Sequence, residues 1–192
     1  LEITPITMDA PAADTAIDCG LAGTVMRFVP PVAALRRGAS LFDGDPHARK
    51  RPMGTIIEAL AGLGVAVSAP GGGPASSLPF TVHGTGEVRG GHLVIDASAS
   101  SQFVSALLLA GARFTEGLHL EHVGKPVPSL DHINMTVAVL RGVGVSVDDS
   151  VPNHWVVSPG PIRAFDQRIE QDLSNAGPFL AAALATRGTV RI

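Results

Sequence analysis

The 192-residue sequence is short of cysteine, of net charge and of long apolar runs. Its one cysteine, Cys19, has no partner for an internal disulfide, which is typical of a reducing compartment, so we expect a cytoplasmic location. The formal net charge of -3, from 14 basic and 17 acidic residues, creates no general field for nucleic acid or an anionic membrane. Apolar runs such as "FVSALLLAGA" reach about half the length of a membrane-spanning helix. Any anion must therefore be bound by a local cluster of residues.

What the sequence does contain is an internal repeat. The stretches "GTIIEALAGLGVAVS" and "NMTVAVLRGVGVSVD" match at a constant offset, with Leu60 against Leu140 and Gly64 against Gly144. Each combines apolar residues at helical spacing, a glycine stop and an alternating segment. We therefore predict a helix followed by a strand in both places, and a structural unit that occurs at least twice.

A second kind of unit precedes each of these stretches and occurs three times. It begins with an aliphatic residue and an acid, passes through a loop of small or polar residues, and continues as an apolar helix expected to end at a glycine: Ile17-Asp18 to Gly38, Ile95-Asp96 to Gly117, and Ile169-Glu170 to Gly188. Alternating strands and helices predict an α/β protein, with about 75 to 80 residues per repeat. The Gly/Pro/Ser-rich segment 69–79 is expected to be a surface loop inside the first repeat.

The loops before the three apolar helices carry residues suited to an anion. A helix N-terminus offers unpaired N–H groups and the positive end of the helix dipole. Gly23 allows a ligand to approach the backbone, while Ser100, Ser101 and Gln102 offer side-chain donors at the same place. Taken singly, Thr24 or either serine is explained as a helix cap. Three parallel loops favour a shared binding site for a phosphate or carboxylate.

Basic residues supply a second indication of anion binding. The segment "GDPHARKRPMG" places Arg49, Lys50 and Arg51 directly before a proline, a residue that is common at the start of helices. Cations are unfavourable at a helix N-terminus unless an anion binds there. We expect Arg51 to contact a ligand and the other two to form a solvated turn. Arg27, on the first turn of its helix, either faces the same place or pairs with an acid.

Other features indicate structure rather than chemistry. The spacing of His119 and His122 is typical of a strand edge and not of a metal site, so we expect no metal. Segment 84–91 is glycine-rich but lacks the helix and the Lys-Ser/Thr pair of a nucleotide loop, and is expected to be a turn. Cys19 is expected to be a small buried apolar residue.

Four motifs together resemble the 5-enolpyruvylshikimate-3-phosphate (EPSP) synthase family, in its actinobacterial form: "LAGTVMRF", "GDPHARKRPMG", "DASASSQFVSALLL" and "IEQDLSNAGPFLAAALATRGTVRI". The family transfers the enolpyruvyl group of phosphoenolpyruvate to the 5-hydroxyl of shikimate 3-phosphate, in the pathway to aromatic amino acids, and is the target of glyphosate. The resemblance implies repeated βαβαββ units of the enolpyruvyl transferase fold, an inside-out α/β barrel, here incomplete.

The resemblance also implies roles for individual residues. Gly23 and Arg51 would contact phosphoenolpyruvate, the phosphate of shikimate 3-phosphate would lie on Ser100 and Ser101, and Gln102 would touch both substrates. In "KPVPSLDHINMT", Ser129 would contact a phosphate and His132 would lie against the shikimate ring, although "KP" offers another match to the family motif. Thr24 and Arg27 complete the expected substrate-binding set, with no cofactor, no nucleic acid and no residue assigned to catalysis.

The resemblance further implies a division of the chain. Residues 1–168 would hold two of the three units of one lobe, and residues 169–192 would begin the second lobe. We therefore expect an internal fragment that is inactive alone and prone to self-association, from an enzyme that is a monomer when whole. The alternatives are a UDP-N-acetylglucosamine enolpyruvyl transferase, which typically carries a cysteine beside the segment of Arg51, a non-catalytic phosphate-binding module, or a plain structural domain.

Overall fold

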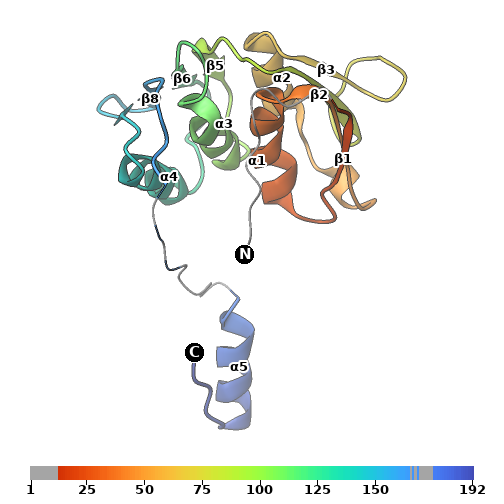
Figure 1. Cartoon of the computed structure of the whole chain (residues 1–192). Coiled ribbons are helices and arrows are strands. Elements are labelled where there is room, and N and C mark those ends of the chain that lie inside the picture. The colour runs from red at the N-terminus through yellow and green to blue at the C-terminus, as the bar shows by residue number, and fades with distance from the viewer. Residues whose placement is uncertain (1–12, 165, 167, 169–174) are drawn as a thin grey trace.

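The computed structural model describes residues 13–164, 166, 168 and 175–192. Two successive groups of elements have the order βαβαββ (Figure 1). The first group is β1 (Thr15–Asp18), α1 (Gly23–Ala34), β2 (Arg37–Asp43), α2 (Gly54–Gly62), β3 (Ala66–Ser68) and β4 (Phe80–Thr85), with a short 3-10 helix, η1 (Ala48–Lys50), before α2. The second is β5 (Gly91–Ile95), α3 (Gln102–Gly111), β6 (Leu118–His122), α4 (Leu130–Gly142), β7 (Val147–Asp148) and β8 (His154–Val157). A further helix, α5 (Gly177–Thr186), follows.

The two groups have the same sheet topology, which confirms the repeat. Strand order is β1-β2-β4-β3 in the first sheet and β5-β6-β8-β7 in the second. In each sheet the first pair is parallel, with Thr15 opposite Ser40 and Gly91 opposite Leu118, and the other pairs are antiparallel. The predicted fold class, α/β with repeated βαβαββ units, is therefore confirmed. The fourth strand of each unit, β4 or β8, was not part of the pattern found in the repeat itself.

The helices join the two units through one shared core. Helix α1 packs on α3, α3 packs on α4, and α2 reaches across to β5 (Figure 1). Apolar residues at helical spacing explain this packing, because they place continuous apolar faces on α1 and α3. The largest fully buried side chains come from both units: Phe42, Phe80, Phe103, Phe114, Met26, Met53, Ile56, Leu60, Leu107, Leu108, Leu118 and Leu120. The two units therefore fold around a common interior.

Two of the predicted helix ends are wrong. Helix α1 ends at Ala34 and α3 at Gly111, well before Gly38 and Gly117. Both glycines instead mark places where backbones meet closely at the start of a strand. Gly38 and Gly117 have φ values of 110° and 69°, and a Cβ on Gly117 would overlap the Val157 carbonyl oxygen. The glycine stop predicted for α5 is close to the observed end, since Gly188 donates its N–H to the Ala183 carbonyl.

Two predicted loops connect strands, and the helix α5 lies outside the two units. The Gly/Pro/Ser-rich segment 69–79 connects β3 to β4, as predicted, and segment 86–90 is the turn between β4 and β5. Helix α5 has no buried residue and lies apart from the sheets in Figure 1. Ile169 and Glu170, where a third strand was expected, lie outside the described residues. None of the helices described combines the length and apolar character needed to cross a membrane.

Candidate functional site

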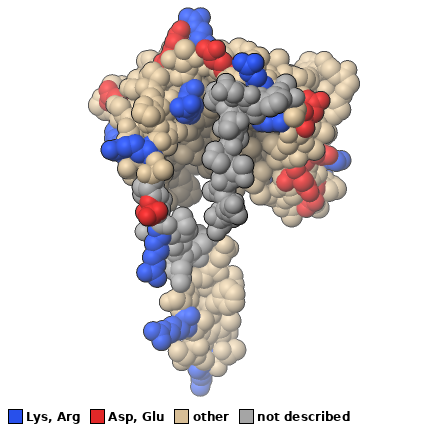
Figure 2. Space-filling model, in the orientation of Figure 1, with Lys and Arg blue, Asp and Glu red and all other residues tan. Residues whose placement is uncertain are grey.

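The first two loops predicted to bind an anion lie next to each other. Strands β1 and β5 lead into the N-termini of α1 and α3, and these two helices pack together. Helix α1 has Ala22 as its N-cap residue, with no side-chain cap, and neither helix has an acidic residue in its first turn. The positive ends of both helix dipoles are therefore left for a ligand. Positive and negative side chains are scattered over the face drawn in Figure 2, so the attraction for an anion is local.

Gln102 is the centre of the predicted site. The Arg27 Nη1 donates to the Gln102 Oε1 at 2.6 Å, and the Arg27 guanidinium lies 5.1 Å from the centre of the Phe103 ring. A Cβ on Gly23 would lie 2.8 Å from the Arg51 Nη1 and 3.7 Å from the Gln102 Oε1. The structure therefore brings Gly23, Arg27, Arg51 and Gln102 together, although they are spread over 80 positions of the sequence.

The two arginines form a cationic pair. Burial, and then the charge of Arg51, lowers the pKa of the Arg27 guanidinium. The Arg27 Nε is buried without a hydrogen-bond partner, and neither arginine forms an ion pair within the described part of the chain. Arg49 differs, because its Nε and Nη2 bind the Asp43 carboxylate at 2.9 and 2.7 Å. Among the described residues, Arg27 and Arg51 therefore keep the capacity to bind an anion.

The serines before α3 have separate positions. The Ser100 hydroxyl accepts the Gln102 N–H at 3.2 Å and so caps the helix. Ser101 is 4% exposed and lines the cavity described in the next paragraph. The interpretation of a serine as a cap therefore holds for Ser100, while Ser101 faces a cavity.

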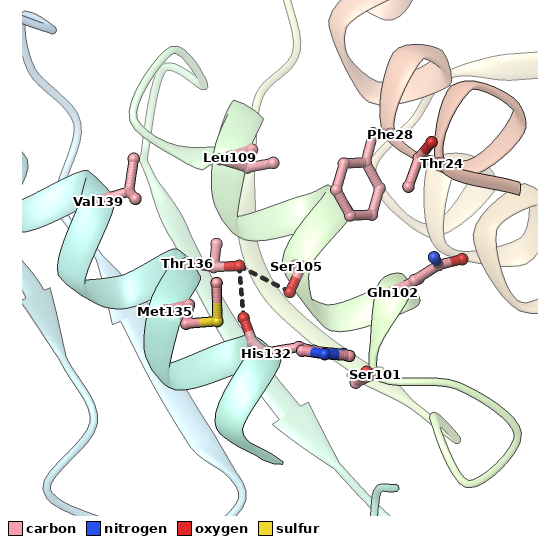
Figure 3. A pocket seen from close by; sticks show the side chains of 10 residues that line it. All are labelled: Thr24, Phe28, Ser101, Gln102, Ser105, Leu109, His132, Met135, Thr136 and Val139. Atoms are coloured by element: carbon pink, nitrogen blue, oxygen red, sulfur yellow. Dashed lines mark hydrogen bonds between the residues drawn. The ribbon is translucent and has the colours of Figure 1, made fainter. Parts of the chain in front are cut away.

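A cavity of about 350 Å³ lies between α1, α3 and α4 (Figure 3). Its lining contains four of the predicted site residues and six that were not predicted: Thr24, Ser101, Gln102 and His132, then Phe28, Ser105, Leu109, Met135, Thr136 and Val139. Thr136 Oγ1 lies 2.9 Å from the Ser105 Oγ, joining α4 to α3. Helical spacing was the signal for the missed residues, because Gln102, Ser105 and Leu109 share one face of α3.

Of the two residues predicted around the start of α4, Ser129 and His132, only one lines the cavity. Ser129 is exposed, has a left-handed backbone with φ 55°, and accepts the His132 N–H through its carbonyl oxygen; it does not line the cavity. His132, one turn further along α4, does. In the described ranges no group of three or more His, Cys, Asp or Glu residues is arranged to hold a metal ion.

Replacing Gly23 with alanine is expected to weaken binding of a phosphate anion at Arg51 about tenfold or more while leaving stability nearly unchanged. The new methyl group would displace the Arg51 guanidinium, which is the end of a flexible side chain. Gly54→Ala is a matched control, because Gly54 is also the first residue of a helix and its Cβ would meet only the Glu58 Oε1 at 3.7 Å. Calorimetry and thermal unfolding test both variants. An unchanged affinity for Gly23→Ala would contradict a ligand at Arg51.

Fold and site together define an α/β repeat protein in which two helix N-termini lie beside two arginines that have no acidic partner among the described residues. Comparison with known proteins narrows this class. The family model of EPSP synthase (3-phosphoshikimate 1-carboxyvinyltransferase) matches residues 3–192. This chain belongs to the EPSP synthase family.

Individual relatives agree with the family. The chain is 54% identical over 191 residues to a 3-phosphoshikimate 1-carboxyvinyltransferase of Mycobacterium ulcerans (strain Agy99), and spans 43% of that relative's length. It is also similar to a structure of EPSP synthase from Acinetobacter baumannii, with a TM-score of 0.70, 26% identity and coverage of 93% of this chain and 39% of the other. A second structure of the Acinetobacter baumannii enzyme gives a TM-score of 0.68 at 26% identity, with 93% and 38% covered.

Proposed function

We propose that this chain supplies the binding surface for shikimate 3-phosphate and phosphoenolpyruvate in an EPSP synthase reaction. The chain spans less than half the length of the curated relative, so the whole reaction is part of the proposal. The convergence of Gly23, Arg27, Arg51 and Gln102 beside the buried Ser101 is the observation that carries it. We also propose a cytoplasmic location, supported by a single free cysteine, Cys19, which is 3% exposed.

The proposed roles follow from donor chemistry. The phosphate of shikimate 3-phosphate binds at Ser100, Ser101 and the N-terminus of α3, where N–H and O–H donors are concentrated. The phosphate of phosphoenolpyruvate binds at Arg51, next to the open space at Gly23. Because the Gln102 Oε1 is occupied by Arg27, the two N–H donors of its amide are left for the substrates.

The part of the site formed by α4 is proposed to hold the cyclohexene ring of shikimate 3-phosphate. His132 lies in the cavity lining, on the same side of α4 as Met135 and Thr136 (Figure 3). The ring of shikimate 3-phosphate would pack against this surface. Ser129 stays a predicted phosphate contact, which would require its exposed hydroxyl to turn toward the ligand.

In the proposed reaction the methylene carbon of phosphoenolpyruvate gains a proton, while the 5-hydroxyl loses its proton and its oxygen bonds to the adjacent carbon, which carries the phosphate. The tetrahedral intermediate then expels inorganic phosphate and loses a proton from the new methyl group, which restores the carbon–carbon double bond. Arg27, Arg51 and the helix N-termini stabilise the phosphate charges throughout. Among the described residues, the cavity lining contains no Asp, Glu or Lys to transfer protons. We therefore expect this chain to bind substrate but to show no turnover on its own.

A titration of this chain with shikimate 3-phosphate, by calorimetry and amide NMR, tests the proposal. We expect saturable binding that weakens at least about tenfold in the double variant Ser101→Ala/Gln102→Ala, because hydrogen bonds to a charged group are lost. Ser76→Ala, in the exposed loop before β4, is a control that should bind normally. UDP-N-acetylglucosamine is the competing ligand, and glyphosate can be tested at the phosphoenolpyruvate position. Equal affinity in parent and double variant would contradict the assignment.

A further inference from the structure

His122, the last residue of β6, is a buried histidine with both ring nitrogens engaged. It is 5% exposed. Its Nδ1 accepts the Ala97 N–H at 3.1 Å, and its Nε2 lies 2.8 Å from the Lys125 carbonyl oxygen. A backbone N–H can only donate and a carbonyl oxygen can only accept. The two contacts therefore require a neutral ring with its proton on Nε2.

The two contacts fix loops on either side of the ring. Both backbone polar groups of Ala97 form hydrogen bonds. Its N–H donates to the His122 Nδ1, and its carbonyl accepts the Ser100 N–H at 3.0 Å. This turn leads directly to Ser100 and Ser101 at the start of α3. Lys125 belongs to the loop between β6 and α4, the helix that carries His132. His122 thus lies beneath both loops of the proposed shikimate 3-phosphate site.

The same loops are also tied together at the surface. The Ser98 hydroxyl lies between the Asp96 carboxylate and the Lys125 carbonyl oxygen, which is 3.0 Å away. Gly124, with φ 111°, passes so close that a Cβ would lie 2.9 Å from the Asp96 Oδ1 and 2.9 Å from the Ser98 Oγ. These contacts leave little room for Ala97 to move without losing its bond to His122.

We propose that His122 is a positioning residue for the phosphate-binding serines, and that only its neutral form holds them in place. The inference rests on the proposed function, in which Ser100 and Ser101 bind the phosphate of shikimate 3-phosphate. A second proton on the ring would go to Nδ1, where it would face the Ala97 N–H, donor against donor. Protonation therefore breaks the bond that fixes the turn before Ser100.

Charged groups near the ring determine how the site responds to acid. In the described residues these are Asp96, from the loop after β5, and Lys125, from the loop after β6. The residue before β8, Asn153, faces the same strand end with an uncharged group, since its carbonyl accepts the His122 backbone N–H at 2.9 Å. Hydrogen bonds from Ser98 hold the pKa of the Asp96 carboxyl below its usual range. Asp96 is therefore ionised over the range tested and does not account for a change in binding between pH 7.5 and pH 5.5.

Three variants separate these contributions. His122→Ala removes both contacts. His122→Asn places a carbonyl oxygen where Nδ1 accepted the Ala97 N–H and cannot titrate. His119→Asn is the matched control, because it lies on the same strand with its side chain exposed on the outer face of the sheet. We expect His122→Ala to bind shikimate 3-phosphate at least about tenfold more weakly at pH 7.5, with His122→Asn in between and His119→Asn unchanged.

The pH dependence of the affinity for shikimate 3-phosphate separates a positioning role from a purely structural role, because a purely structural role would not change it. A phosphate monoester gains a proton near pH 6, so every variant should lose some affinity in acid. We expect the parent to lose more affinity than His122→Asn between pH 7.5 and pH 5.5, because only the parent has a ring nitrogen at which a second proton would break the Ala97 bond. Equal slopes for the two proteins, or parental affinity in a folded His122→Ala, would overturn the proposal.

A measurement without ligand keeps the two proposals distinct. The 15N shifts of the His122 ring report the tautomer, and we expect a protonated Nε2 and a bare Nδ1. Amide exchange at Ala97 should be slow in the parent and in His122→Asn and faster in His122→Ala. A proton found on Nδ1 in the parent would overturn the role of His122 even if the variants fail to fold. The expected tautomer with no binding of shikimate 3-phosphate by the parent would overturn the proposed function instead.

Discussion

Gly90→Ala is expected to destabilise the fold by about 3 kcal/mol or more, because it adds a backbone penalty to a steric overlap. Gly90 has φ 81°, a left-handed conformation that residues with a Cβ rarely adopt. Its Cβ would overlap the Gly117 carbonyl oxygen and lie 2.8 Å from the Phe114 Cβ. A backbone carbonyl inside a sheet connection cannot move aside as a flexible side chain can. Such a loss is a large fraction of the stability of a typical domain.

Urea unfolding followed by circular dichroism measures this effect. Gly73→Ala is the matched control, since Gly73 lies in the surface loop between β3 and β4 and has open space around its Cβ position. We expect no destabilisation in the control, and a lower midpoint with an unchanged slope for Gly90→Ala. A midpoint equal to that of the parent would show that the connection between the two units tolerates a Cβ.

The reason for the large effect is the position of Gly90 between the two units. It ends the segment that follows β4 and precedes β5, and the Gly91 N–H bonds the Gly117 carbonyl at 3.0 Å. Gly117 in turn lies against the Val157 carbonyl at the end of β8. The starts of β5 and β6 and the end of β8 therefore meet through close backbone contacts, which explains why Gly117, predicted as a helix stop, belongs to a sheet connection.

Local periodicity was enough to predict the elements and their repetition. Apolar spacing placed α1, α2, α3 and α4, and the matched pair Gly64 and Gly144 marks the same turn after α2 and α4, with φ values of 82° and 86°. The last strands of each unit, β4 (Phe80–Thr85) and β8 (His154–Val157), lie outside the two matched stretches and were not found in the repeat. Each pairs with a strand far away in the sequence, β2 or β6, and partner choice is a tertiary property.

Site residues were predicted where the donor chemistry was local to one loop. Ser100, Ser101 and Gln102 are adjacent in sequence, so their shared role was visible, whereas Ser105 and Thr136 meet only because α3 packs on α4. For His122, by contrast, no pattern in the sequence indicated its role. It was interpreted together with His119 as part of a strand edge, but β6 is an inner strand, with His119 exposed and His122 buried. The partners of His122 come from two loops that no sequence pattern connects.

Arg51→Ala is expected to lower the affinity for phosphoenolpyruvate by about ten- to a hundredfold, measured with shikimate 3-phosphate at saturation, since one charged contact to a phosphate is lost. Arg49→Ala is the closest comparison in the chain. Arg49 lies two positions earlier, but its guanidinium is held by Asp43 in an exposed bidentate pair and so is not free to bind a ligand. We expect its affinity to stay within about twofold of the parent, and its stability to change little.

Salt distinguishes a direct contact from a general loss of positive charge. Both variants remove one positive charge from the same segment, so a long-range effect would weaken both equally and would be screened beyond about 10 Å at 0.1 M salt. A direct Arg51 contact, beside the partly buried Arg27, is screened less and should leave the two variants different at 0.3 M as well as at 0.05 M salt. Equal losses in Arg49→Ala and Arg51→Ala would mean that the segment acts only through its net charge, and phosphoenolpyruvate would then have to be placed away from Gly23. A difference that persists at high salt would place the phosphate at Arg51, within reach of the Gln102 amide.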